Sequence, residues 1–146
     1  DWLIGQMLAR HFAGDTRVTF QIPDGTDALV PVYDSMFLLT HGDQVGGGGG
    51  IGGVWPPIMR MVAKKRVRHD FDTLVCGHWH QLIMAPSSGL IVNGSTKGYD
   101  EYAAVSNFVP ERAQQALWTV APEHGPTFLA PVFWNYLREE LSALAA

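Results

Sequence analysis

The chain has 146 residues, of which 47% are apolar and 16% are charged, and its formal net charge is −4. This length and composition fit one globular domain with a buried core. The negative charge argues against general electrostatic attraction to nucleic acid. No apolar run reaches the roughly 20 residues that cross a bilayer, so no membrane partner is expected. Because the chain opens on Asp1, we expect a processed product or an excerpt.

The first part of the chain predicts a helix and a β-hairpin. Residues 2–12 place their apolar side chains at helical spacing. Residues Thr16–Ile22 alternate between polar and apolar side chains, which predicts a half-buried strand. Pro23–Asp27 has the composition of a turn, and Leu29–Tyr33 is then a second, antiparallel strand.

The middle of the chain predicts a strand–helix–strand unit. Ser35–His41 is apolar almost throughout, as in a central strand. The glycine-rich stretch Val45–Val54 is a flexible loop, because ordering glycine costs maximal backbone entropy. Pro56–Arg68 is a helix with proline in its first turn, and Phe71–Cys76 is the next strand.

Two features of this unit carry chemical information beyond its fold. The basic run Lys64–His69 is typical of a solvated helix end, with contact to a phosphate-bearing substrate as the alternative. Cys76 is the only cysteine, so no disulfide forms within the chain. Its apolar surroundings indicate a buried, inert thiol, and a reducing, cytoplasmic compartment fits this usage.

The second half of the chain predicts short strands with one irregular segment. In order, we expect a hairpin, a polar loop, an irregular segment, an antiparallel pair and a closing helix, at residues 82–93, 93–98, 99–109, 113–133 and 134–144. This order of strands and helices predicts an α/β fold class, with mixed β-sheets and flanking helices.

Two predicted strands end in histidine beside glycine, at Thr40-His41-Gly42 and at Gly77-His78-Trp79-His80. In a strand–helix–strand unit the strands run parallel, and their carboxyl ends lie at one edge of the sheet. If the second segment stays extended, His78 and His80 point to the same face. His41, His78 and His80 then converge, and three imidazoles suit a metal ion. The alternative is a set of hydrogen-bonded histidines at strand ends.

Trp79 lies between two of these histidines and would point away from both. We interpret it as a buried anchor beneath the sheet edge, with stacking against a substrate as the alternative.

Together, His41, the Gly77–His80 motif and Val92-Asn93-Gly94-Ser95 resemble the C-terminal half of the calcineurin-like metallophosphoesterases, phage type. That family has a lone His after a hydrophobic strand, then Gly-His-x-His, then Asn-(Pro)-Gly-Ser. The likeness spans roughly Val18 to Tyr102. The family's earlier motifs, Asp-x-His, Gly-Asp-x-x-Asp and Gly-Asn-His-Asp/Glu, are absent. The resemblance implies an α+β sandwich that forms the C-terminal half of a metallophosphoesterase-like fold. Residues 1–146 are therefore interpreted as a single, partial domain.

The resemblance implies a metal-dependent phosphoester hydrolase, either a phosphodiesterase or nuclease or a phosphatase. It implies two divalent transition metals (Mn, Fe, Zn, Ni or Co), with His41 and His78 on one and His80 on the other as catalytic ligands. Gly42 and Asn93 are candidates for substrate binding. The implied partner is a phosphoester substrate, with nucleic acid or nucleotide as candidates. Because half a fold leaves a sheet edge exposed, a second copy of the chain is one way to cover it.

One alternative function stays open. The same histidines would serve a non-catalytic metal-binding or interaction module, because the carboxylates of the family's first half are missing. A cupin-type barrel is excluded, since no glutamate follows His-x-His within Gln81–Ala85.

Overall fold

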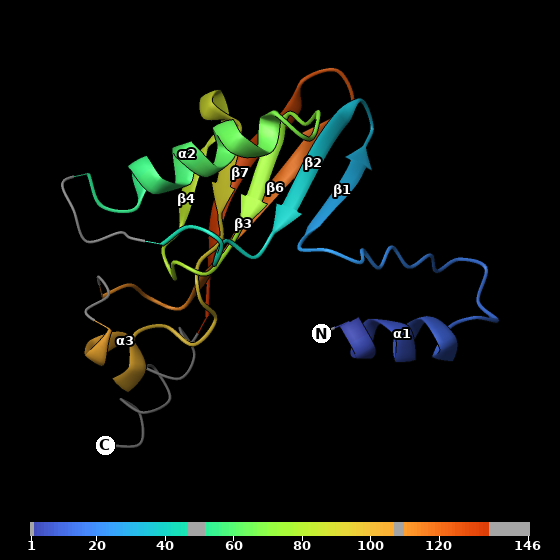
Figure 1. Ribbon diagram of the computed structural model, residues 1–146, viewed down its shortest axis with the longest axis horizontal. Helices are drawn as coiled ribbons and strands as arrows, with labels where there is room; N and C mark the ends of the chain where they lie inside the picture. The colour runs from blue at the N-terminus through green and yellow to red at the C-terminus, as the bar shows by residue number, and fades with distance from the viewer. Residues whose placement is uncertain (1, 47–51, 107–109, 135–146) are drawn as a thin grey trace.

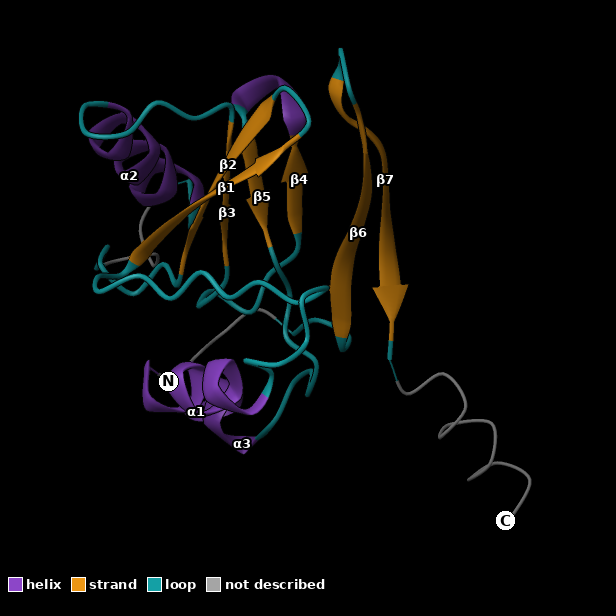
Figure 2. Ribbon diagram, turned by 90° about the vertical axis from the view of Figure 1, so that its right-hand side faces the viewer, coloured by secondary structure: helices purple, strands orange, loops and turns teal. Residues whose placement is uncertain are grey.

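A computed structural model of the chain describes residues 2–46, 52–106 and 110–134 (Figure 1). The elements in chain order are α1 Trp2–His11, β1 Asp27–Val32, β2 Ser35–Thr40, α2 Trp55–Arg66, β3 Thr73–Cys76, β4 Ile83–Ala85, the 3-10 turn Pro86–Ser88, β5 Leu90–Val92, α3 Glu101–Val105, β6 Gln114–Ala121 and β7 Gly125–Phe133. Figure 2 shows three layers: helix α2, a mixed sheet and the β6–β7 hairpin. In the described part of the chain, no helix is long and apolar enough to cross a membrane. The predicted fold class, a mixed α/β sandwich with flanking helices, is confirmed.

The central sheet has five strands in the order β1-β2-β3-β5-β4. Strands β2, β3 and β5 are parallel, and β1 and β4 pair antiparallel at the two edges. Helix α2 connects β2 to β3, as the strand–helix–strand prediction requires. The carboxyl ends of the three parallel strands therefore meet at one edge of the sheet, and α3 lies beyond that edge in both views (Figures 1 and 2).

Alternation along β2 and β3 separates the two faces of the sheet. Leu38 and Leu74 face α2, and both are fully buried against its Ile58, Met61 and Val62. This face holds the main core, because α2 presents its apolar stripe to it. The helix predicted over Pro56–Arg68 is confirmed as α2.

The opposite face of the sheet packs on the β6–β7 hairpin. Phe37 and Ile91 are buried there, and the ring of Phe37 lies 6.2 Å from that of Trp118 on β6. The predicted antiparallel pair and the predicted hairpin of β4 and β5 are both confirmed.

Two segments, Thr16–Ile22 and residues 101–105, differ from the elements that the sequence predicts. Thr16–Ile22 forms no strand, because β1 takes β2 as its antiparallel partner through the tight turn at Tyr33 and Asp34. The segment contacts β1 through the Gln21 side chain, whose amide donates to the Leu29 carbonyl at 2.8 Å. Residues 101–105, expected to be irregular, form α3.

The centre of the glycine-rich loop and nearly all of the predicted closing helix lie outside the described residues.

Candidate functional site

The carboxyl edge of the sheet brings His41 and His78 together, as the parallel strands predict. The Gly77 N–H donates to the His41 carbonyl at 3.0 Å, so the chain segments leaving β2 and β3 stay side by side. The two imidazole rings lie 5.3 Å apart, centre to centre, at an interplanar angle of 72°. Both side chains are exposed, so a ligand can reach the pair from solvent.

Gly42 allows this close approach of the two segments. Its φ of +106° is a conformation that side-chain-bearing residues rarely adopt. A Cβ at this position would lie 3.1 Å from the Gly77 carbonyl oxygen and 3.3 Å from the Cβ of His78. Glycine here therefore determines the distance between His41 and His78.

The segment from His78 to His80 is a turn and not a continuation of strand β3. The φ angles of His78 and His80 are +69° and +55°, in the left-handed region. The Trp79 N–H donates to the Gly77 carbonyl at 2.8 Å, which closes the turn. The expectation of an extended segment, with both histidines on one strand face, was therefore wrong. Non-glycine residues in this conformation are strained and are concentrated at functional sites.

Trp79, between these two histidines, is half-buried and packs against the core cluster. Its ring lies 5.4 Å from that of His78, edge to face. The indole Nε1 is buried and has no hydrogen-bond partner in the described part of the chain. These contacts favour the interpretation of Trp79 as an anchor that holds the turn on the sheet edge.

His80 lies near the loop that precedes α3. The Lys97 ammonium, followed by the Ala103 N–H, lowers the pKa of the Asp100 carboxyl, and the charge of His80 contributes to the same lowering. Asp100 also caps α3, because its side chain accepts a hydrogen bond from Ala103 N at 2.9 Å. Asp100 is thus an acidic side chain near His80 that sequence reasoning did not select.

The histidine nitrogens at this edge fit part of the metal site that the resemblance implies. Two nitrogen ligands on one tetrahedral zinc ion place their ring centres about 5 Å apart, and the His41–His78 pair matches that spacing. No group of three His, Cys, Asp or Glu side chains able to hold a metal ion occurs within residues 2–46, 52–106 and 110–134. Burial raises the pKa of the Cys76 thiol to about 12, because its apolar surroundings disfavour the thiolate. The described residues fit a two-histidine contribution to a metal site.

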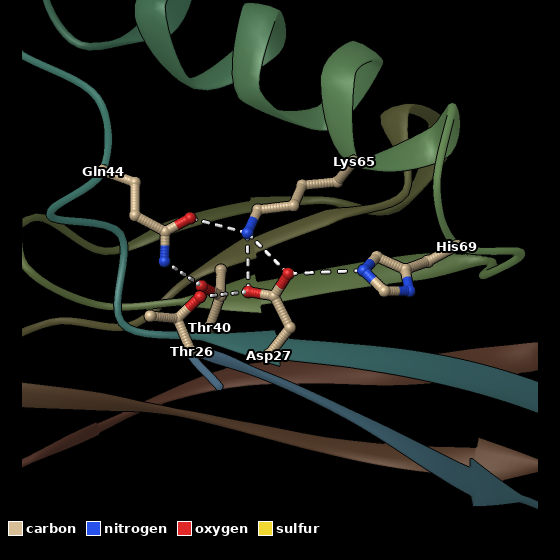
Figure 3. Close-up of polar contacts among 6 residues, drawn as sticks. All are labelled: Thr26, Asp27, Thr40, Gln44, Lys65 and His69. Atoms are coloured by element: carbon tan, nitrogen blue, oxygen red, sulfur yellow. Dashed lines mark hydrogen bonds and ion pairs between the residues drawn. The ribbon is translucent and has the colours of Figure 1, made fainter. Parts of the chain in front are cut away.

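A polar network that sequence reasoning missed supports the loop after His41 (Figure 3). The Lys65 ammonium donates to both oxygens of Asp27 and to the Gln44 Oε1, each at 2.6 Å. The Gln44 amide in turn donates to the Thr40 hydroxyl at 3.2 Å. Helix α2 is thereby tied to the amino end of β1 and to the residues on both sides of His41.

Asp27 is the centre of that network. Burial raises the pKa of its carboxyl, but the hydrogen bonds from Lys65 and Thr40 outweigh this effect, and the pKa lies below its usual value. His69 lies 3.4 Å from the same carboxylate. Asp27 precedes Lys65 by 38 residues, so no local pattern in the sequence reveals the pair.

The Asn93-Gly94-Ser95 motif attaches the β6–β7 hairpin to the main sheet. The Asn93 side chain donates to Gln115 at 2.6 Å and accepts from the Ala116 N–H at 2.8 Å. A Cβ on Gly94 would lie 2.6 Å from the Gln114 carbonyl oxygen. These contacts give Asn93 a structural role, and its part in substrate binding stays a prediction.

The site therefore consists of an exposed histidine pair at the carboxyl edge of a mixed sheet.

No protein-family model and no curated protein sequence matches this chain. Among solved structures, it is similar to wild-type Vps29 from Entamoeba histolytica complexed with Zn²⁺, at 15% identity and a TM-score of 0.47, covering 80% of this chain and 67% of that one. A single mutant of the same protein gives 16% identity and a TM-score of 0.48, covering 81% and 67%.

A third similar structure is Vacuolar Protein Sorting 29 from Cryptosporidium parvum. It gives 15% identity and a TM-score of 0.44, covering 82% of this chain and 62% of that one. All three identities are below 25% and all three TM-scores are below 0.5, so the family assignment rests on the sequence motifs and belongs to the proposal below.

Proposed function

We propose that this chain supplies the histidine-rich half of the metal site of a phosphoester hydrolase of the calcineurin-like type. His41 and His78 bind one divalent metal ion, and His80 belongs to a second ion in the same site. The substrate is a phosphoester, with a nucleotide or nucleic acid as candidates. The observation that supports this proposal most directly is the 5.3 Å separation of the two imidazole rings at the ends of parallel strands.

The chemistry of the residues is consistent with this role. Imidazole nitrogen suits Mn, Fe, Zn, Ni and Co ions. A divalent ion bound there supplies Lewis-acid stabilisation of the phosphoryl oxygens and an activated water. The chain itself holds the two rings at a fixed spacing through Gly42, and Trp79 fixes the turn that carries His78. Because neutral imidazole is the ligand form, metal affinity falls as the solution is acidified.

Metal titration of the purified chain tests this proposal. We expect His41→Ala and His78→Ala each to weaken binding of Zn²⁺ or Mn²⁺, measured by calorimetry, by at least about tenfold. The matched control is His124→Ala, because His124 is exposed in the turn between β6 and β7. Unchanged affinity in His41→Ala and His78→Ala would remove the basis of the proposal.

A second candidate function is a metal-binding or interaction module without hydrolysis. It is favoured by the lack of a carboxylate that joins the histidine pair in the described part of the chain. Hydrolysis of bis(4-nitrophenyl) phosphate by the Mn²⁺-loaded chain separates the two. Turnover that disappears in His78→Ala supports the hydrolase, whereas metal binding without turnover supports the module.

A further inference from the structure

A pocket of about 560 Å³ lies between helix α2 and residues 44–46, the segment that follows His41. This volume is in the range of small-molecule sites in proteins. One wall is the side of α2 that carries its basic residues, and the other begins at Gln44. The Lys65–Gln44 hydrogen bond of 2.6 Å joins the two walls and belongs to the network of Figure 3.

Three cations follow one another along the helical wall of this pocket. Arg60, Lys64 and Arg68 are spaced four residues apart, which places them on one side of the helix. The backbone N–H of Arg68 donates to the Lys65 carbonyl at 2.9 Å, so the helical course continues past the end of α2. All three side chains are exposed and accessible to a ligand.

These three cations have no acidic partner among the described residues. The ion pairs found there involve Arg17, Lys65, His69 and Lys97. No Asp or Glu lines the pocket, and Asp27, the carboxylate bound to its wall, is already neutralised by Lys65. Three like charges close together repel one another, and an anion placed between them removes that repulsion.

A solvated helix end does not account for this arrangement. Basic residues are stabilising within the last turn of a helix, and that effect covers Lys64 but not Arg60, which lies more than a turn earlier. The pocket also has an apolar part, formed by the half-buried Val45 and by Val67, which is 86% exposed. Cations beside apolar surface match a ligand that has both an anionic group and an apolar body.

We propose that this pocket binds a small phosphate-bearing molecule, with Arg60, Lys64 and Arg68 on the phosphates and Val45 and Val67 beside the apolar body. A nucleic acid fits less well, because the net charge is −4 and binding along a duplex needs an extended basic surface. The inference depends on the α2 pocket alone. It stands whether or not the histidine pair binds metal.

Calorimetric titration of the chain with ATP in the presence of EDTA tests the proposal, because EDTA prevents a metal ion from joining the phosphates to the histidines. We expect Lys64→Ala and Arg68→Ala each to weaken ATP binding by about tenfold, since each removes a charge-assisted hydrogen bond. The matched control is Arg10→Ala, an exposed arginine in the last turn of α1, for which we expect unchanged affinity. Added salt should weaken binding to the unmodified chain.

Three results would overturn the proposal. The first is no detectable binding of ATP by the unmodified chain. The second is an equal loss of affinity in Arg10→Ala, which would indicate unspecific attraction. The third is tighter binding of a short DNA duplex than of ATP at equal phosphate concentration, which would assign the three cations to nucleic acid. Because the substituted side chains are exposed, far-ultraviolet circular dichroism should show the same fold in all variants.

Discussion

The Asp27 carboxylate is the point at which strand β1, helix α2 and the loop after His41 meet. Its two oxygens accept from Lys65, and Thr26 donates to one of them at 3.1 Å. The side chains of Lys65 and Asp27 are 12% and 16% exposed, so solvent screens this pair less than a surface ion pair. Removing one partner is expected to destabilise the fold, because the other charge stays largely buried without its partner.

Asp27→Asn should therefore destabilise the protein by about 2 kcal/mol at pH 7, the range of hydrogen bonds to charged groups. The pKa of Asp27 is lower in the folded chain than its ordinary value of 3.8. Its contribution to stability is thus present above that value and is lost as the pH falls through the folded-state pKa. Urea unfolding at a series of pH values should show the difference between Asp27→Asn and the unmodified protein shrinking below about pH 4.

Two further variants show whether the pH dependence comes from the Asp27 carboxylate. Asp24→Asn changes an exposed carboxylate in the preceding turn and should leave stability nearly unchanged. Repeating the comparison in a His69→Gln background removes the imidazole whose Nε2 lies 3.4 Å from Asp27. A difference that stayed constant down to pH 2.5 would show that the charge of Asp27 is not the source of the stability.

The histidines show how far single residues can be predicted. The meeting of His41 and His78 followed from two apolar strands, a connecting helix and the parallel pairing that this order imposes. The orientation of His80 did not follow, because it depends on left-handed φ angles at His78 and His80, which residue type does not indicate. The Asp27–Lys65 pair was missed because it joins residues that are distant in sequence.

At the scale of elements, helices α1 and α2 have similar amphipathic patterns and different surroundings. Helix α2 buries Pro57, Ile58, Met61 and Val62, whereas α1 buries none of its residues. Helix α1 lies apart from the sheet in both views, and its Gly5 approaches Ile22 instead (Figures 1 and 2). The pattern predicted both helices correctly, but periodicity does not tell which helix has a sheet to pack on.

A pair of matched substitutions measures this difference. Ile58→Ala should cost about 2–5 kcal/mol, because Ile58 is fully buried between α2 and the sheet. Leu8→Ala should cost less than about 1 kcal/mol, because Leu8 in α1 is 45% exposed. Both free energies come from urea unfolding. Equal costs would mean that α1 packs against the rest of the chain in solution.

The errors in assigning elements have a similar cause. The alternation in Thr16–Ile22 is a true strand pattern, but a strand also needs a neighbour, and β1 pairs with β2. Helix α3 is only five residues long, so its apolar periodicity is too short to detect. The sequence signal for α3 is Asp100, because aspartate is a common N-cap residue and it directly precedes Glu101.

For the whole molecule, stability depends on how the three layers are joined. Helix α2 and the sheet share the larger core, while the hairpin meets the other face around Phe37 and Ile91. The Asn93 side chain links the end of β5 to β6 through two hydrogen bonds. Since these contacts come from β2, β5 and the turn after β5, the hairpin cannot leave without exposing parts of several strands.

We therefore expect the sheet and the hairpin to unfold as one unit. Hydrogen exchange in increasing urea should give the same opening free energy for peptides of β2–β3 and of β6–β7. Phe37→Ala should lower both values together, by about 3–5 kcal/mol, because Phe37 is 3% exposed and contacts Trp118. Thr127→Ala, on the exposed side of the hairpin, is the control with little effect on either value. If the hairpin peptides opened at lower urea than the sheet, the third layer would be a separate folding unit, and the histidine edge would depend on the α2 core alone.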